Sequence, residues 1–256
     1  MAANEPGQPA VAEVTSGVAN LAVPESVLAI GAHPDDVEFG AGGTLAKWAA
    51  SGCVVHHLIC TDGSKGTWDV HADTVALAHR RKAEQREAAR RLAGARAGEV
   101  RFLDEVDGEL DSDLATRSRV ARVIRELRPQ VVLGHDPWKR YRLHPDHRHA
   151  GLLVCDAVVA ARDPHFFRDH GLAHHRPDAL VLWEADTPNH VEDVSEHIET
   201  KLAALEAHES QFETTMQATD EAGIDAFRGR IRARLAELGA PFGFAAAERF
   251  RLIDDL

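Results

Sequence analysis

The stretch Ser26-Val-Leu-Ala-Ile-Gly-Ala-His-Pro-Asp-Asp36 joins an apolar run to a polar turn that carries one histidine and two carboxylates. The run at 26–32 has no charged side chain and the length of a buried strand. A second turn of the same kind, His144-Pro-Asp-His147, comes shortly after another apolar run, Val131-Val-Leu-Gly134. The two turns therefore predict one site that is formed at the ends of two strands.

Strands and helices are expected to alternate along the chain. The predicted strands are 26–32, 53–60, 100–103, 131–134 and 179–183, and the predicted helices are 42–50, 74–93, 114–127, one beginning near Arg148, 194–209 and 221–238. This alternation is typical of an α/β fold with a doubly wound, mostly parallel, Rossmann-like sheet and helices on both faces. In the strand order 3-2-1-4-5, the first and fourth strands are neighbours at the switch point, where such sheets bind ligands.

The 256 residues suit a single domain, because no internal linker or repeat divides them. Residues 1–23, rich in alanine, proline, glycine and small polar residues, are expected to form a flexible leader, and 24–256 the domain. The leader lacks the charged start and apolar core of a secretory signal. No apolar run reaches about 18 residues, so no membrane span is expected.

Charge and cysteine content limit the partners. A net charge of −12 argues against nucleic acid or an anionic membrane as the ligand. Three cysteines without a C-x-x-C pair indicate neither a disulfide framework nor a zinc knuckle, so a cytoplasmic location is expected. A homo-oligomer is compatible with the sequence.

The spacing of the two turns favours a metal site. Residues at i and i+3 of a turn or helix start project to one side, so His33 and Asp36 can share a cation while Asp35 points elsewhere. Asp35 is then placed to accept a proton from water beside the cation. Pro145 suits the first helical position, with His144 as the cap and His147 one turn along. The spacing does not decide which histidine is a ligand and which polarises a carbonyl or protonates a leaving amine.

The two turns, quoted in full as Gly31-Ala-His-Pro-Asp-Asp-Val-Glu-Phe-Gly-Ala-Gly-Gly-Thr44 and His144-Pro-Asp-His147, resemble the LmbE-like (PIG-L) family of zinc-dependent N-acetylglucosaminyl deacetylases. The similarity extends over about residues 26 to 251. Its supporting segments are Thr61-Asp-Gly63, the helix around Arg80 and Arg81, Asp107-Gly108, His208-Glu-Ser-Gln211 and Ala247-Glu-Arg-Phe250.

The resemblance implies a role for each site residue. His33, Asp36 and His147 would bind Zn²⁺, with Fe²⁺ as the alternative metal. Asp35 would be the general base, and His144 the general acid that also holds the oxyanion, oriented by Asp146. The implied reaction hydrolyses the acetamide of an acylated amino sugar, which is the expected small-molecule partner.

The candidate substrate contacts come from the segments around this site: Asp107, Arg81, Lys65, Trp68, Tyr141 and Arg142. Two of these positions depart from the family pattern. Arg142 stands where family members that act on thiol-precursor sugars have tyrosine, with Tyr141 one position earlier. Ser64-Lys65 replaces the usual glutamate after the Thr-x-Gly turn, so Lys65 and Arg140 are expected to favour an anionic or more polar substrate.

Two alternatives stay open. The same metal centre would also serve an amidase acting on a larger sugar–cysteine or natural-product conjugate. A non-catalytic nucleotide or sugar-phosphate binding module, in which both His-Pro-Asp turns are structural, would hold no stoichiometric metal.

Overall fold

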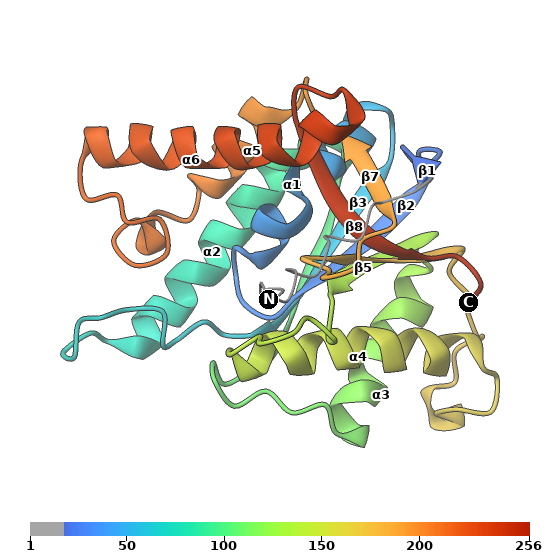
Figure 1. The fold of residues 1–256 in the computed structure, drawn as a ribbon. Helices are drawn as coiled ribbons and strands as arrows, with labels where there is room; N and C mark the ends of the chain where they lie inside the picture. The colour runs from blue at the N-terminus through green and yellow to red at the C-terminus, as the bar shows by residue number, and fades with distance from the viewer. Residues whose placement is uncertain (1–17) are drawn as a thin grey trace, which may run out of the picture.

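Strand β2 (Ser26–Gly31) lies near the middle of an eight-stranded sheet in the computed structural model, which describes residues 18–256 (Figure 1). The sheet order is β1-β7-β8-β6-β5-β2-β3-β4. Its parallel core contains β4 (Ala97–Glu105), β3 (Val54–Thr61), β2, β5 (Val131–His135) and β6 (Ala179–Trp183). This core confirms the predicted order 3-2-1-4-5.

Three strands beyond this core were missed by the sequence analysis. Strand β8 (Ala247–Ile253) runs antiparallel between β6 and β7 (His190–Asp193), and β1 (Val18–Ala19) pairs in parallel with β7. Charged residues interrupt β7 and β8, so neither shows an apolar run. Most of the predicted leader, 1–17, lies outside the described residues, but Val18 already pairs in the sheet, short of the predicted boundary at 23.

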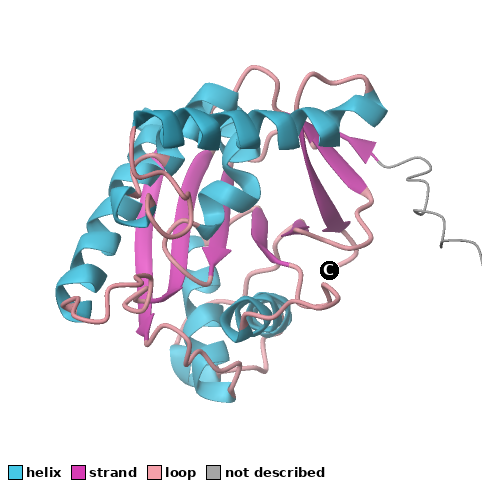
Figure 2. Cartoon of the chain, turned by 60° about the vertical axis from the view of Figure 1, so that its left-hand side comes forward, coloured by secondary structure: helices cyan, strands magenta, loops and turns pink. Residues whose placement is uncertain are grey.

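Helices cover both faces of the sheet (Figures 1 and 2). On one face are α1 (Asp36–Ala50), α2 (Thr74–Ala93), α5 (Ile198–Leu205) and α6 (Glu221–Gly239); on the other are α3 (Leu114–Leu127) and α4 (Pro145–Arg162). Helices α2 and α3 have the predicted bounds. Helix α1 begins at Asp36 rather than residue 42, so the first His-Pro-Asp turn runs directly into it.

Alternate residues of β2 face the two helical layers, as expected for a strand buried on both sides. Leu28 and Ile30 belong to the core under α3 and α4, whereas Val27 and Ala29 belong to the core under α1. All four side chains are fully buried. Both layers therefore fix β2, and with it the turn that follows.

A buried ion pair ties α1 to the last strand. The Nζ of Lys201 lies 2.6 Å from Glu248 Oε1 and donates to the Phe39 carbonyl at 2.7 Å. Glu248 also accepts hydrogen bonds from the backbone N–H groups of Gly43 and Thr44, at 2.9 and 2.8 Å. Inside a helix such groups ordinarily bond to the carbonyl four residues earlier. Glu248 therefore holds α1 by its backbone.

Candidate active site

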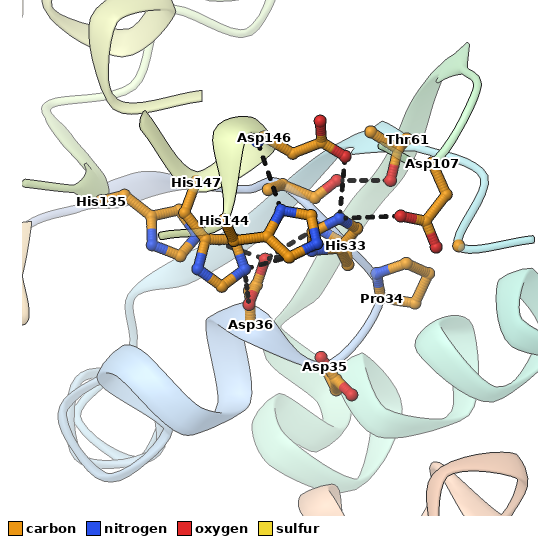
Figure 3. Close-up of polar contacts among 12 residues, drawn as sticks. His33, Pro34, Asp35, Asp36, Thr61, Asp107, His135, His144, Asp146 and His147 are labelled. Atoms are coloured by element: carbon orange, nitrogen blue, oxygen red, sulfur yellow. Dashed lines mark hydrogen bonds and ion pairs between the residues drawn. The ribbon is translucent and has the colours of Figure 1, made fainter. Parts of the chain in front are cut away.

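The two His-Pro-Asp turns meet at the carboxyl ends of the adjacent strands β2 and β5 (Figure 3). The Nδ1 of His33 lies 3.2 Å from His147 Nε2 and 3.5 Å from Asp36 Oδ2. The Nε2 of His147 lies 3.3 Å from Asp36 Oδ1. Three metal-capable side chains, from two turns more than a hundred residues apart in the chain, thus converge as the sequence predicted.

His33 is surrounded by carboxylates. Its Nε2 lies 3.0 Å from Asp146 Oδ2 and 3.2 Å from Asp107 Oδ1. Burial opposes a charge on the imidazole, but the hydrogen bonds to Asp107, Asp146 and Asp36 outweigh burial and raise the pKa of His33. Because Nε2 points at two acceptors, it carries the proton, and Nδ1 is directed at Asp36 and His147.

Asp146 differs from its predicted role. Its carboxylate does not orient His144 but accepts from His33 Nε2 and from the backbone N–H groups of Gly108 and Leu110, at 2.6 and 3.2 Å. His144, the cap of α4, instead accepts the backbone N–H of Asp146 on its Nδ1 at 3.3 Å. A neutral His144 therefore carries its proton on Nε2 and offers it outward as a donor.

Asp35 sits in a strained backbone conformation. Its φ of 102° lies in the left-handed region that non-glycine residues rarely adopt. Its backbone N–H donates to Gln85 Oε1 at 3.0 Å, and its carboxylate lies 3.4 Å from the guanidinium of Arg81. Arg81, predicted to contact substrate, is buried and also donates to the carbonyls of Pro34 and Gly63. Its hydrogen bonds are thus to the site's own residues.

The environment of Asp35 tunes its acidity. Burial raises the pKa of this carboxyl to about 6, against the opposing charge of Arg81. Asp36, by contrast, has a pKa held well below its usual range, because His147 and His135 outweigh the effect of burial. The pKa values of the two neighbouring carboxyls are therefore shifted in opposite directions, which is expected of residues with different roles.

His135, the last residue of β5, was missed by the sequence analysis. Its Nε2 lies 3.2 Å from Asp36 Oδ2, on the same carboxylate that faces His33 and His147. The Nδ1 of His135 receives the indole N–H of Trp183 at 3.0 Å and lies 3.1 Å from Arg142 NH1. Asp36 raises the pKa of His135 despite its burial. Position at the end of β5 was the one available signal.

Arg142 is buried behind the site. Its NH1 lies 2.7 Å from Glu184 Oε2 and 3.3 Å from His147 Nδ1. Tyr141, by contrast, is 87% exposed and does not line the pocket that contains His33. Neither residue lines this pocket: Arg142 contacts His135, His147 and Glu184.

A pocket of about 440 Å³ opens beside the convergence point. Lys65, Trp68, Asp107 and Arg81 line it and stay candidate substrate contacts. The other lining residues include Gln211, from a segment that supports the family resemblance, and Thr214 and Thr215, which the sequence analysis did not single out. The Lys65 ammonium lies 2.8 Å from Glu109. A larger cavity, of about 630 Å³ beside α6 and β8, has no histidine in its lining and lies apart from this chemistry.

Both His-Pro-Asp turns lie within a region that matches a known protein family. The model of the PIG-L family, described as GlcNAc-PI de-N-acetylase, matches residues 28–158, which include both His-Pro-Asp turns. The chain belongs to the PIG-L family. A diacetylchitobiose deacetylase of Thermococcus kodakarensis is 41% identical over 191 residues, covering 73% of this chain and 70% of the relative.

A second relative and a solved structure are also deacetylases. A 1D-myo-inositol 2-acetamido-2-deoxy-alpha-D-glucopyranoside deacetylase of Rhodococcus opacus is 35% identical over 180 residues, covering 62% of this chain and 58% of the relative. The structure of N,N'-diacetylchitobiose deacetylase from Pyrococcus horikoshii, complexed with its inhibitor MPG, superposes with a TM-score of 0.81 and 30% sequence identity. The superposition covers 90% of this chain and 84% of the Pyrococcus chain. These PIG-L relatives are deacetylases, which hydrolyse amide C–N bonds, and they support the hydrolase interpretation over the binding module.

Two further observations bear on the surroundings of the protein. Within residues 18–256, no helix combines the length and apolarity required to cross a membrane. The three cysteines are free, with Cys53 and Cys60 buried. The cytoplasmic location and the oligomeric state stay predictions.

Proposed function

We propose that this PIG-L protein is a zinc-dependent deacetylase that removes the acetyl group from the amide nitrogen of an N-acetylglucosamine-type sugar, with diacetylchitobiose as the first substrate to test. The observation that carries the proposal is the convergence of His33 Nδ1, Asp36 and His147 Nε2, 3.2 to 3.5 Å from one another, at the wall of the pocket.

The three residues fit a zinc ion. Zn–N and Zn–O bonds of about 2.0–2.1 Å in tetrahedral geometry require ligand atoms about 3.3 Å apart. The two imidazole nitrogens, 3.2 Å apart, have this separation, and Asp36 presents Oδ2 to His33 at 3.5 Å and Oδ1 to His147 at 3.3 Å. In its neutral form His33 would carry its proton on Nε2, which faces carboxylates, and would leave Nδ1, directed at the other two proposed ligands, for the metal. In the same state His147 carries its proton on Nδ1, so Arg142 NH1 would turn from it toward Glu184, 2.7 Å away.

The metal and the protein divide the chemistry. A bound zinc ion supplies Lewis acidity, which polarises a carbonyl oxygen and lowers the pKa of water. Asp35 lines the pocket without belonging to the three ligands, so it can take the proton of an attacking water (Figure 3). His144, the general acid implied by the resemblance, would protonate the leaving amine. His144 presents Nε2–H to the pocket, where it stabilises the oxyanion that forms as water attacks the amide.

The pocket supports an uncharged sugar more than an anionic one. Lys65, which the sequence analysis expected to attract an anion, is paired with Glu109, and the guanidinium of Arg140 lies 4.0 Å from Asp186. Asp107 and Trp68 remain as a hydrogen-bond acceptor and an aromatic face in the lining, a combination typical of sugar sites. A neutral N-acetylated sugar is therefore the substrate class that the pocket fits best.

The test combines metal content with turnover. Purified protein should contain about one zinc per chain and release amine from diacetylchitobiose, and a chelator should abolish the release. Asp35→Asn should retain zinc but lower kcat by about 10²- to 10⁴-fold, the contribution of a general base. Asp111→Asn, a matched change of a carboxylate with 73% side-chain exposure, should leave kcat unchanged.

Two outcomes would refute the proposal. Purified protein without stoichiometric metal would favour the binding module, and full activity of Asp35→Asn would reject Asp35 as the base. If no N-acetylated sugar releases amine but a larger sugar–cysteine or natural-product conjugate does, the alternative amidase would be favoured.

A further inference from the structure

The backbone of the proposed base, Asp35, is bound by side chains of the neighbouring helix. Helices α1 and α2 lie side by side on one face of the sheet (Figure 1). Arg81 and Gln85 are four residues apart on α2, so their side chains project from the same face of this helix. Both side chains are buried, and both reach the peptide group that joins Pro34 to Asp35.

The two sides of this peptide group have different partners. Arg81 Nη2 donates to the Pro34 carbonyl at 2.5 Å, and Gln85 Oε1 accepts the backbone N–H of Asp35 at 3.0 Å. Within residues 18–256 this N–H makes no other hydrogen bond. Because the carbonyl and the N–H of a planar peptide group point in opposite directions, the two bonds together fix its orientation.

A fixed peptide group matters here because of the conformation of Asp35. A residue other than glycine stays at a φ of 102° only where the surrounding structure imposes it. Gln85 does not line the pocket, so it has no contact with a substrate there. Its effect on the reaction therefore passes through the backbone of Asp35.

The amide of Gln85 has one orientation that satisfies its neighbours. A backbone N–H is a donor only, so the atom of Gln85 that faces Asp35 is the carbonyl oxygen. The amide nitrogen then faces Glu38, whose Oε1 accepts it at 2.7 Å. Glu38 is fully buried and lies between two histidines, with Oε2 at 3.3 Å from His208 Nε2 and Oε1 at 3.6 Å from His57 Nε2. Glu38 therefore keeps the oxygen of Gln85 directed at Asp35.

We propose that Gln85 is a positioning residue for the base. Together with Arg81 it holds the Pro34–Asp35 peptide group, and Glu38 orients its amide, so that the Asp35 carboxylate stays at the wall of the pocket. The inference rests on the proposed function, because Asp35 is the proposed base.

The first test removes the amide. In zinc-loaded Gln85→Met, kcat on diacetylchitobiose should fall about 10- to 100-fold with KM little changed, because a small displacement of a reacting group has an effect of this size. In an Asp35→Asn background the same change should lower kcat no further, since Gln85 acts through that carboxylate. Hydrogen exchange of the Asp35 amide, followed by NMR, should be faster in Gln85→Met than in wild type.

The second test reverses the donor and the acceptor between residues 38 and 85. Gln85→Glu still offers an oxygen to the Asp35 N–H, but it places a second carboxylate against Glu38, so kcat should fall. Adding Glu38→Gln supplies a donor to that carboxylate, and the double variant should recover most of the lost kcat and the protection of the Asp35 amide. A double variant no better than Gln85→Glu would overturn the inference.

The chain offers a matched control in Gln130. Its Oε1 accepts the backbone N–H of Glu25 at 2.8 Å and its Nε2 donates to Asp178 at 2.7 Å, just before β5 and at the opposite end of this strand from the site. Gln130→Met should leave kcat unchanged. Equal losses of kcat in Gln130→Met and Gln85→Met, or a further loss in the Asp35→Asn background, would overturn the inference.

Failure of the proposed function would be seen separately. A wild-type protein that binds no zinc or hydrolyses no acylated sugar would overturn that function. The exchange rate of the Asp35 amide would still show whether Gln85 holds the peptide group, so the two failures are distinguishable.

Discussion

Replacing Lys201 by methionine should destabilise the protein by about 3 kcal/mol. The side chains of Lys201 and Glu248 are 3% and 4% exposed, and their charged atoms are 2.6 Å apart. Removing one partner of such a buried pair costs about 3–5 kcal/mol, because the other charge is left uncompensated. Glu248 keeps three donors, the N–H groups of Gly43 and Thr44 and the Thr44 hydroxyl, which places the loss at the lower end.

Urea unfolding at neutral pH measures this loss, and a thermal scan should show Tm lower by about 6–12 °C, at about 2–4 °C per kcal/mol for a chain of this size. Lys139→Met is the control, because its pair with Glu184 spans 3.5 Å between side chains 35% and 44% exposed and should contribute less than about 1 kcal/mol. Equal losses for the two variants would refute the reasoning. So would strict additivity of Lys201→Met and Glu248→Gln, since contacting charges should couple.

Two further predictions concern an acid-sensitive contact and the pocket rim. Burial favours protonation of Glu192, but hydrogen bonds from His190, Lys47 and the Leu21 N–H lower its pKa. The stability advantage of wild type over Glu192→Gln, followed by urea unfolding, should therefore be complete at pH 7 and shrink as the pH falls below about 4.3; an advantage that grows on acidification would contradict this. Trp68→Ala should raise KM for diacetylchitobiose about 2- to 12-fold with kcat unchanged, because the 78% exposed ring offers stacking worth about 0.5–1.5 kcal/mol; unchanged KM would exclude stacking.

The sequence predicted those site residues that lie within short motifs. His33, Asp36 and His147 could be found because each lies in a short turn after a strand, and the strand order placed both turns together. The residues that surround the proposed ligands and Asp35 could not be found this way. Gln85 is 50 residues from Asp35, and His135 is 48 residues from Trp183. Neither pair therefore falls within one short sequence motif.

The role predicted for Asp146 came from the family resemblance, which implied that its carboxylate orients His144. In the structure the first turn of α4 brings the backbone N–H of Asp146, and not its carboxylate, to His144. The carboxylate is then free to accept the N–H groups of Gly108 and Leu110, whose loop position depends on the whole sheet. The resemblance indicated that these two residues meet, but not through which atoms.

The place of β8 in the sheet has a consequence for biosynthesis. This strand follows the other seven strands of the sheet in chain order, yet it fills the gap between β6 and β7 and carries the glutamate that binds the backbone of α1. A nascent chain that already contains both His-Pro-Asp turns therefore still lacks this anchor for the helix that begins at Asp36. The proposed cation site should accordingly mature late in folding, when β8 is inserted.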